Sequence, residues 1–238
     1  MTMRPLFSAK CGDCPASFEF LELGYAVVPD VVGDEEIDEI ARLVDDNVMS
    51  GAGTRRLINL PWCTALAERL AGDRRFAEVL PVDARPVQCT LFTKSTTNNW
   101  LVSLHQDLSI PVAERIESSE YHGWSEKEGE LFVQPPASVL DGVVAVRLHL
   151  DDCDERNGAL RVVPGSHRLG RLTAAEAMRT RDAHGEICVR VPRRGAMVMK
   201  PLLLHASSKA STNNMRRVLH FVFGPKEAPG ALRWSARV

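Results

Sequence analysis

The stretch Trp100-Leu101-Val102-Ser103-Leu104-His105-Gln106-Asp107 is a short β-like run that ends in an H-x-D triplet, and it guides the interpretation of the whole chain. Alternate side chains of an extended segment share one face, so His105 and Asp107 can reach one metal ion while the residue between them points elsewhere. The third ligand must then come from a strand that is distant in sequence and adjacent in space. His205 is the candidate, because it follows the apolar run 196–204, which is expected to be a buried strand.

These three residues match a known ligand set. Two imidazoles and one carboxylate on one face of an octahedral ion leave three positions open, as in non-haem Fe(II) oxygenases. We therefore expect His105, Asp107 and His205 to be the metal ligands and the catalytic centre of a metal-dependent oxygenase. Histidine and aspartate also suit zinc with a water in the fourth position, so a zinc-dependent hydrolase is one alternative. A non-catalytic β-barrel that binds a ligand is the other.

Short β-like runs dominate the chain from residue 87 onward. Clusters of Gly, Pro and Asn separate them, which is typical of a sandwich or barrel. The expected strands cover residues 87–93, 100–105, 143–150, 160–163, 187–191, 196–204 and 218–223. The stretch 111–138 is expected to be a long connection that serves as a lid, forms a binding element or is disordered.

Helical patterns precede these strands. Residues 34–48 carry apolar side chains at helical spacing and acidic residues in the first turn, which predicts an amphipathic helix packed outside the barrel. A second helix is expected at 62–70, with a further helical segment at 75–80.

The length and charge of the chain limit its organisation and its partners. A chain of 238 residues can form one compact core, so we expect a single domain over residues 1–238, with helical support at about 18–86 and a β core at about 87–224. Its 29 Lys and Arg against 31 Asp and Glu give a net charge of −2, which offers no basic field for nucleic acid or for an anionic membrane. A small molecule is the expected partner, and the oligomeric state is left open.

No stretch of the sequence predicts export or membrane insertion. The N-terminal region has no apolar run typical of a signal peptide, and no later run approaches the length of a membrane span, so a cytoplasmic location is expected. In that reducing compartment Cys63, Cys89, Cys153 and Cys188 are expected to be free thiols. Cys11 and Cys14 form a single CxxC pair, which is expected to lie in a mobile N-terminal segment and not in a metal or redox site.

Three further motifs surround the triplet. Residues 157–167 have the sequence NGALRVVPGSH, residues 24–29 have the sequence GYAVVP, and an H-A-S motif at His205 is followed by Arg216. With these motifs the sequence resembles, over about residues 18–224, the phytanoyl-CoA dioxygenase family of Fe(II)/2-oxoglutarate-dependent oxygenases. The resemblance implies a mainly β fold with flanking helices, a double-stranded β-helix or cupin-like jelly roll. It also implies that Fe(II), 2-oxoglutarate and O2 are used to hydroxylate or otherwise oxidise a small molecule.

The resemblance assigns roles around the cosubstrate. Arg216 matches the arginine downstream of the family's H-x-S motif, and the planar fork of an arginine suits the distal carboxylate of 2-oxoglutarate. Ser207 would add a hydroxyl donor to the same carboxylate. Trp124, seventeen residues after Asp107, resembles a family tryptophan that lines the cosubstrate pocket, and an aromatic plug at the barrel mouth is the alternative. Because halogenating relatives lack the carboxylate ligand, Asp107 favours hydroxylation over halogenation.

Other polar residues near these motifs have two interpretations each. Lys94 and Asn99 precede the triplet and either donate hydrogen bonds to 2-oxoglutarate or substrate, or are solvated turn residues. Strand alternation should turn Arg217 to the face opposite its neighbour, where it is expected to be a solvated arginine. His167 is expected to make structural hydrogen bonds, and His220 to face the barrel interior.

The run 143–150 provides the expected substrate contact. Alternation places Arg147 and His149 on one face, toward the cavity, and the apolar residues on the other, against the helices. A buried cation is costly unless an anion meets it, so a substrate with a carboxylate, anchored by Arg147, is expected. An internal salt bridge to Asp151 or Asp152 is the alternative. Acyl-CoA, an amino acid or another small acid, and a natural-product intermediate all remain open as substrates.

Overall fold

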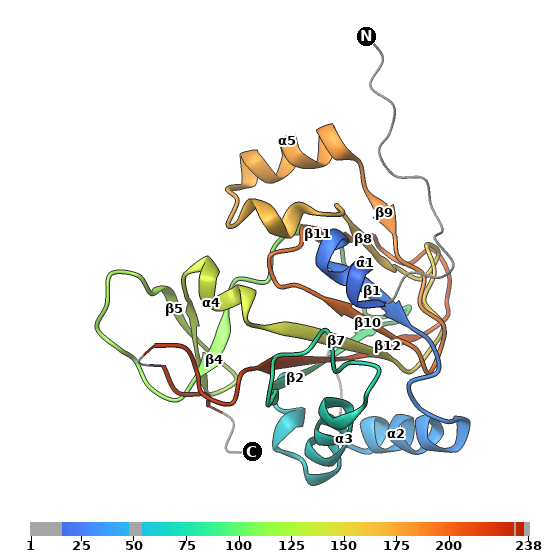
Figure 1. The fold of residues 1–238 in the computed structure, drawn as a ribbon. Coiled ribbons are helices and arrows are strands. Elements are labelled where there is room, and N and C mark those ends of the chain that lie inside the picture. The colour runs from blue at the N-terminus through green and yellow to red at the C-terminus, as the bar shows by residue number, and fades with distance from the viewer. Residues whose placement is uncertain (1–15, 48–53, 231, 236–238) are drawn as a thin grey trace.

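Two antiparallel sheets form the β core of the computed structural model, which describes residues 16–47, 54–230 and 232–235 (Figure 1). The larger sheet has five strands in the order β1 (Tyr25–Val28), β10 (Ala196–Met199), β7 (Val144–His149), β12 (Arg216–Gly224) and β2 (Arg85–Lys94). The smaller sheet has four, in the order β3 (Val102–His105), β11 (His205–Ser207), β8 (Leu160–Val162) and β9 (Ile187–Cys188). Met197 from the larger sheet and Val162 from the smaller one share an inner hydrophobic cluster, so the two sheets face each other. The expected jelly roll is confirmed.

Helices α2 (Asp34–Asn47) and α3 (Pro61–Gly72) cover the outer face of the larger sheet, and α1 (Ala16–Leu23) lies beside its edge strand β1, with Phe20 in the same core. Their apolar side chains share one core with that sheet, and Figure 1 shows α2 and α3 beneath it. In α2 the buried residues are Ile37, Ile40 and Val44, at the spacing of an amphipathic helix. The helices expected at 34–48 and 62–70 are confirmed.

Strand β7 separates the two faces of the larger sheet. Val146 and Leu148 pack into the core that the helices cover. The alternate residues Arg147 and His149 therefore point to the space between the sheets. All residues of β7 are buried, so these two polar side chains depend on partners inside the fold.

The expectation of one strand over 196–204 is wrong. Strand β10 ends before Lys200, and the chain turns at Pro201, which has no N–H to continue the ladder. A hydrogen bond from the backbone N–H of Leu203 to the carbonyl of Lys200 (3.1 Å) closes this corner. The chain crosses to the other sheet there, and β11 begins at His205.

The stretch 111–138 is a folded unit and not an open connection. It contributes to a three-stranded sheet in the order β4 (Ile110–Val112), β6 (Glu130–Gln134) and β5 (His122–Lys127), and α4 (Ala137–Asp141) follows it. Ile110, Val133 and Leu140 belong to a separate hydrophobic cluster that fixes this unit. Its strands have only three to six residues, too few alternations to be recognised in the sequence. The unit lies at the left of Figure 1.

Further elements lie where none is expected: α1, β1, α5 (Ala174–His184) and the short 3-10 helices η1 (Leu57–Asn59) and η2 (Ser166–Leu169). Helix α5 has one buried residue, so it lacks an apolar stripe, but a capping box formed by Thr173 and Glu176 begins it. Conversely, the helix expected at 75–80 is wrong. The N–H of Val79 bonds to the carbonyl of Phe76 (3.0 Å), three residues back, as in a turn.

The motif 157–167 attaches the N-terminal segment to the core. His167 Nε2 lies 3.2 Å from the carbonyl oxygen of Leu21 at the end of α1. The imidazole packs against Gly24, where φ is +82° and a Cβ atom would lie 2.4 Å from His167 Nδ1. Only glycine fits this corner, and the structural role expected for His167 agrees with this contact.

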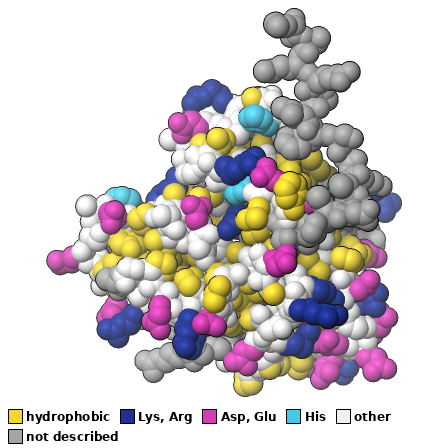
Figure 2. Space-filling view, viewed as in Figure 1, with side chains coloured by type: hydrophobic (Ala, Val, Ile, Leu, Met, Phe, Trp, Pro, Cys, Tyr) yellow, Lys and Arg dark blue, Asp and Glu magenta, His cyan; other side chains and the backbone are white. Residues whose placement is uncertain are grey.

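Surface and cysteine features complete the description. None of the helices in the part of the chain that the structure describes is long and apolar enough to cross a membrane. On the face drawn in Figure 2, Lys and Arg side chains are interspersed with Asp and Glu side chains. Among the described cysteines, Cys63, Cys89, Cys153 and Cys188 are free thiols, as expected. Cys11 and Cys14 lie outside the described residues.

Candidate metal centre and cosubstrate cavity

The smaller sheet brings the two histidines of the expected triad together. His105 ends β3, His205 begins β11, and the two are direct cross-strand partners with ring centroids 4.2 Å apart. Asp107 lies beyond the end of β3, where its backbone N–H donates to the carbonyl of Pro201 (2.9 Å). The carboxylate oxygens of Asp107 lie 3.6 Å from His105 Nε2 and 3.7 Å from His205 Nε2. One ligand atom from each residue lies within 4.8 Å of the other two, so all three can reach one ion.

Hydrogen bonds orient both imidazoles for metal binding. His105 Nδ1 lies 2.8 Å from the carbonyl oxygen of Ser103, and His205 Nδ1 lies 2.9 Å from that of Leu203. A carbonyl oxygen can only accept, so each Nδ1 carries the proton. Each Nε2 therefore directs its lone pair toward Asp107, as in metal sites whose histidines are fixed by a second hydrogen bond.

The charge states also suit a metal ion. Burial lowers the pKa of His205 to about 4, so this imidazole is neutral near pH 7. Burial works against ionisation of Asp107, but the interactions with His205 and His105 hold the pKa of this carboxyl well below its usual range. Metal ligands must be deprotonated, so the pair presents a neutral imidazole and a carboxylate, the forms that a divalent ion requires.

Two cavities meet at the triad, and His105 and Asp107 line both. The inner cavity has about 90 Å³ and lies between the two sheets; the outer cavity has about 380 Å³ and lies between the larger sheet and the three-stranded sheet. Both the inner and the outer cavity would give access to an ion bound at the triad. The arrangement allows one molecule to bind behind the metal and another in front of it.

Three buried cations line the inner cavity: Lys94, Arg147 and Arg216. None of them forms an ion pair with a carboxylate of the described residues. The Nε atoms of Arg147 and Arg216 have no hydrogen-bond partner. Buried charges and donors of this kind are costly without an anion, so the cavity fits a small dicarboxylate such as 2-oxoglutarate.

The carbonyl of Gly158 anchors this group of side chains. It accepts from Arg216 (2.7 Å) and from the hydroxyl of Ser207 (2.8 Å). Lys94 Nζ donates to Ser207 Oγ (2.6 Å) and to the carbonyl of Ser208 (2.5 Å). The hydroxyl of Ser207 therefore donates its proton to the carbonyl of Gly158, and its oxygen accepts from Lys94. This arrangement holds Lys94 beside Arg216.

Burial also sets the charge of the lysine. It lowers the pKa of Lys94 to about 8, and the positive charge of Arg216 acts in the same direction. Arg147 stays charged near pH 7, because burial and Arg216 lower its pKa only to about 10. The inner cavity is therefore positive at neutral pH.

A comparison with family models now identifies the chain. The model of the phytanoyl-CoA dioxygenase (PhyH) family matches residues 20–218, which include the triad, the cations of the inner cavity and the motif 157–167. This chain belongs to the phytanoyl-CoA dioxygenase family. The family consists of non-haem iron oxygenases, so the chain is an Fe(II)- and 2-oxoglutarate-dependent enzyme that uses O2, and the expected resemblance is confirmed.

Three solved structures are similar to this family member. The α-ketoglutarate-dependent carbocyclase SnoK from nogalamycin biosynthesis is 15% identical, with a TM-score of 0.63 over 93% of this chain and 87% of its own. HygX from Streptomyces hygroscopicus, with nickel, 2-oxoglutarate and hygromycin B bound, is 19% identical, with a TM-score of 0.60 over 89% and 86%. EctD from S. alaskensis, in its apo form, is 17% identical, with a TM-score of 0.64 over 98% and 88%. A comparison with curated protein sequences found no match.

Trp124, expected from the family resemblance, and Asn99, a candidate donor to 2-oxoglutarate or substrate, both lie away from the two cavities. Trp124 is not among the residues that line either cavity; it packs in the cluster of the three-stranded sheet, 5.3 Å from the guanidinium of Arg115. The side-chain amide of Asn99 forms two hydrogen bonds with the backbone of Ala210 (2.7 and 2.8 Å) and so joins two loops. Trp100 lines the inner cavity instead, 5.8 Å from Lys94 Nζ. The path of the loop decides which aromatic reaches the site, and the sequence does not reveal it.

Arg147 points inward as expected, and the alternative of an internal salt bridge is wrong. Asp151 pairs with Arg217 (2.9 Å), and Asp152 accepts from the backbone N–H of Arg193 (2.8 Å). However, Arg147 lines the inner cavity with Lys94 and Arg216, and not the outer cavity. Its expected role as substrate anchor therefore requires a substrate that enters the inner cavity.

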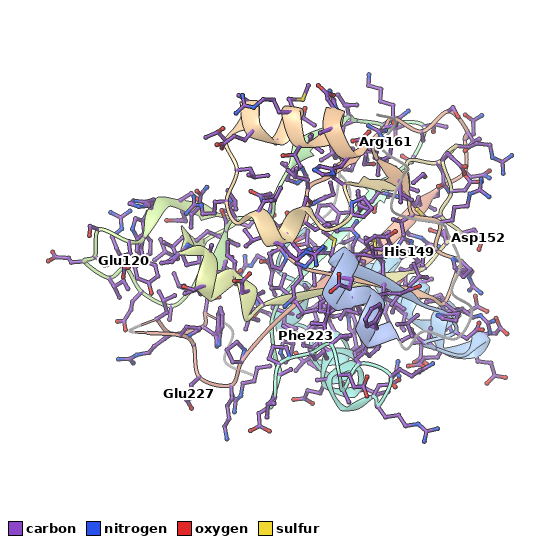
Figure 3. The ribbon with its side chains drawn as sticks, turned by 45° about the horizontal axis from the view of Figure 1, so that its top comes forward. Glu120, His149, Asp152, Arg161, Phe223 and Glu227 are labelled. Carbon is purple, nitrogen blue, oxygen red and sulfur yellow. The ribbon has the colours of Figure 1, made fainter. Side chains whose placement is uncertain are left out.

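The other residues expected near the substrate are also placed by the structure. Neither ring nitrogen of His149 has a hydrogen-bond partner, and this residue lines neither cavity; Figure 3 shows it in the interior. Burial, with the charges of Arg147 and Arg216, holds the pKa of His149 well below its usual range. His220 faces inward as expected and lies 2.7 Å from Arg147. Arg217 points to the opposite face, but it binds Asp151 and is not a freely solvated arginine.

Proposed function

We propose that this family member is a single-domain hydroxylase of a small molecule, with His105, Asp107 and His205 as the ligands of Fe(II). Arg216 and Lys94 would hold the distal carboxylate of 2-oxoglutarate in the inner cavity, and the substrate would occupy the outer cavity. One observation carries the proposal. Buried cations without a carboxylate partner in the described residues share a cavity with three convergent metal ligands.

The chain's residues would bind and orient the reactants. When bound, the iron centre of this family couples the oxidative decarboxylation of 2-oxoglutarate to the transfer of one oxygen atom to a substrate carbon, with succinate and carbon dioxide as the other products. Arg216 and Lys94 would fix the cosubstrate at the metal by charge-assisted hydrogen bonds. The nearly full burial of both cations excludes water from that end of the site. Asp107 supplies the carboxylate ligand, which favours hydroxylation over halogenation.

The two alternatives explain less of the site. A zinc hydrolase needs a bound water and an open face, but it has no use for the buried cations behind the metal. A non-catalytic binding barrel could use the inner cavity, but it does not require two imidazoles that are both hydrogen-bonded so that Nε2 faces one carboxylate. Both groups of residues are used in a 2-oxoglutarate oxygenase.

Succinate formation tests this proposal. The purified full-length chain, given Fe(II), 2-oxoglutarate and O2, should release succinate, and metabolite extracts should contain a compound that gains one oxygen atom. Asp107→Ala should weaken Fe(II) binding by at least about tenfold, since even outer partners of metal ligands contribute that much. The exposed carboxylate of Asp182 provides the matched control, and Asp182→Ala should behave as wild type. Fe(II) binding that is unchanged in Asp107→Ala, or an absence of succinate with wild type, would contradict the proposal.

A further inference from the structure

The floor of the outer cavity carries a polar group of side chains beside the apolar Phe92, Ala145 and Val222. Gln88 and Thr90 of β2 and His220 of β12 point into it from the inner face of the larger sheet, and all three are buried. Gln88 Nε2 donates to Thr90 Oγ1 (2.7 Å), and His220 is the direct cross-strand partner of Thr90. A floor of buried hydrogen-bonding groups is costly against a hydrocarbon chain, which would leave these groups without partners. The three polar groups suit polar atoms on the ligand, and the apolar side chains beside them suit its carbon skeleton.

The tautomer of His220 adds a donor to this floor. Nδ1 of His220 lies 2.7 Å from a terminal nitrogen of Arg147. A guanidinium group has no acceptor, so Nδ1 must accept and Nε2 must carry the proton. Burial, together with the charge of Arg147, lowers the pKa of His220 to about 3, so the ring is neutral. His220 therefore presents its Nε2–H group as a hydrogen-bond donor, and the contact with Arg147 fixes the orientation of the ring.

Two cations lie on the opposite side of the outer cavity. Arg55 is already paired: its guanidinium lies 3.1 Å from Glu128, and its backbone N–H donates to the same carboxylate (3.0 Å). Lys127, at the end of β5, has no ion pair or hydrogen bond with any carboxylate among the residues that the structure describes, and its Nζ lies 4.7 Å from the ring centroid of Phe132. Asp107 is the one acidic residue among the described residues that line this cavity, and the proposed metal would bind its carboxylate.

We propose that Lys127 binds the carboxylate of the substrate, and that the substrate is a small acid whose other polar groups meet Gln88, Thr90 and His220. This inference rests on the proposed function, because it places the substrate in front of the same metal centre. It replaces Arg147 with Lys127 as the anchor of an acidic substrate. A single unpaired lysine at the side of a cavity of about 380 Å³ gives one charged contact, and the floor supplies the neutral ones.

The test compares acids with their neutral amides. The full-length protein is saturated with Ni(II) and 2-oxoglutarate, which prevents turnover. Calorimetry then measures the affinity for three acids that carry a hydroxyl group and for their amides: L-threonine and L-threoninamide, 4-hydroxybenzoate and 4-hydroxybenzamide, and 4-hydroxycyclohexanecarboxylate and its amide. Wild type should bind at least one acid more tightly than its amide, by about tenfold, as expected for a charge-assisted contact. Lys127→Met should abolish this preference and leave the amide affinity unchanged, whereas Lys127→Arg should retain it.

Controls separate this inference from the proposed function. Lys226→Met, at an exposed lysine after β12, should keep the preference of wild type. If wild type fails to bind Ni(II) and 2-oxoglutarate, the proposed function is wrong. If it binds both but prefers no acid of the panel over its amide, only the assignment of an acidic substrate is wrong. Retention of the acid preference in Lys127→Met would likewise overturn the role of Lys127.

Discussion

Arg216 and Lys94 lie directly opposite each other in the β12–β2 pair, and both side chains enter the inner cavity almost without exposure to solvent. Like charges in such cross-strand positions destabilise a sheet, and burial adds the cost of desolvation. Their hydrogen bonds to Ser207 and to the carbonyl of Gly158 satisfy donors but do not neutralise charge. The pair is therefore suited to a ligand that supplies negative charge, and the predictions below follow from it.

The affinity for 2-oxoglutarate should depend on the charge of Lys94. Burial, and then Arg216, lowers the pKa of Lys94 to about 8. Above this pH the free protein must take up a proton to bind the dianion, so the dissociation constant should rise by up to about tenfold per pH unit. Anaerobic titration of the Fe(II)-loaded protein between about pH 6.5 and about pH 9.5 measures the slope. Lys94→Met should bind more weakly and show a flat profile; an equal slope in this variant would assign the titration to another group.

The stability of the ligand-free protein should change with pH in the opposite direction. The folded-state pKa of Lys94, about 8, lies below the value of 10.5 for an unperturbed lysine. Between these two values the unfolded chain binds more protons, so the contribution of this residue to the free energy of unfolding rises with pH. Urea unfolding of wild type and Lys94→Met across this window isolates the contribution. A fall with pH that is specific to wild type would contradict the assigned shift.

Arg147 and Lys127 should affect different ligands. Arg147 lines the inner cavity, so Arg147→Met should weaken 2-oxoglutarate binding severalfold and leave the amide probes nearly unaffected. Lys127 lines the outer cavity, so Lys127→Met should leave the affinity for 2-oxoglutarate unchanged. The same calorimetric titrations measure both. A weakened affinity for 2-oxoglutarate in Lys127→Met, together with normal affinity in Arg147→Met, would reverse the assignment of the two cavities.

Gly158 should tolerate no side chain. Its φ is +84°, and a Cβ atom would lie 2.8 Å from the carbonyl oxygen of Ser208 and 2.9 Å from Lys94 Nζ. Gly185 provides the matched control, because its φ is +78° and nothing lies within 4 Å of a Cβ there. Both alanine variants should lose about 1–2 kcal/mol through backbone strain. Gly158→Ala should lose more, and it alone should weaken 2-oxoglutarate binding, as urea unfolding and calorimetry would show. Equal losses in both variants would remove the close approach as a cause.

Two of the three ligands could be predicted because His105 and Asp107 lie two residues apart, and the apolar run before His205 points to the third. Strand alternation is not the whole reason, because β3 ends at His105 and a backbone hydrogen bond to Pro201 fixes Asp107. The single strand expected before His205 is wrong, because the chain turns at Pro201 and crosses to the other sheet before it reaches this ligand. Periodicity shows which residues are buried, but it does not show where a buried segment crosses from one layer to the other.

Side chains that reach the site from irregular or weakly patterned segments could not be predicted. The choice between Trp100 and Trp124 depends on the three-dimensional path of the segment, and no local pattern encodes it. Lys127 comes from the edge strand β5, whose only paired strand among the described residues is the short strand β6, so its approach to the cavity depends on tertiary structure. Arg147 was placed on the correct face, but which of two cavities that face borders is also a tertiary property.

Anaerobic titration of 2-oxoglutarate, with and without Fe(II), tests the central claim most directly. Wild type should bind 2-oxoglutarate tightly only when Fe(II) is present, and Arg216→Met should weaken that binding by about 10–150-fold, from the loss of about 1.5–3 kcal/mol. Arg217→Met should keep the affinity of wild type, because Arg217 faces outward and binds Asp151 and Asp45. An affinity for 2-oxoglutarate that does not depend on Fe(II), or equal losses of affinity in the two arginine variants, would contradict a cosubstrate site that is linked to the metal and contains Arg216.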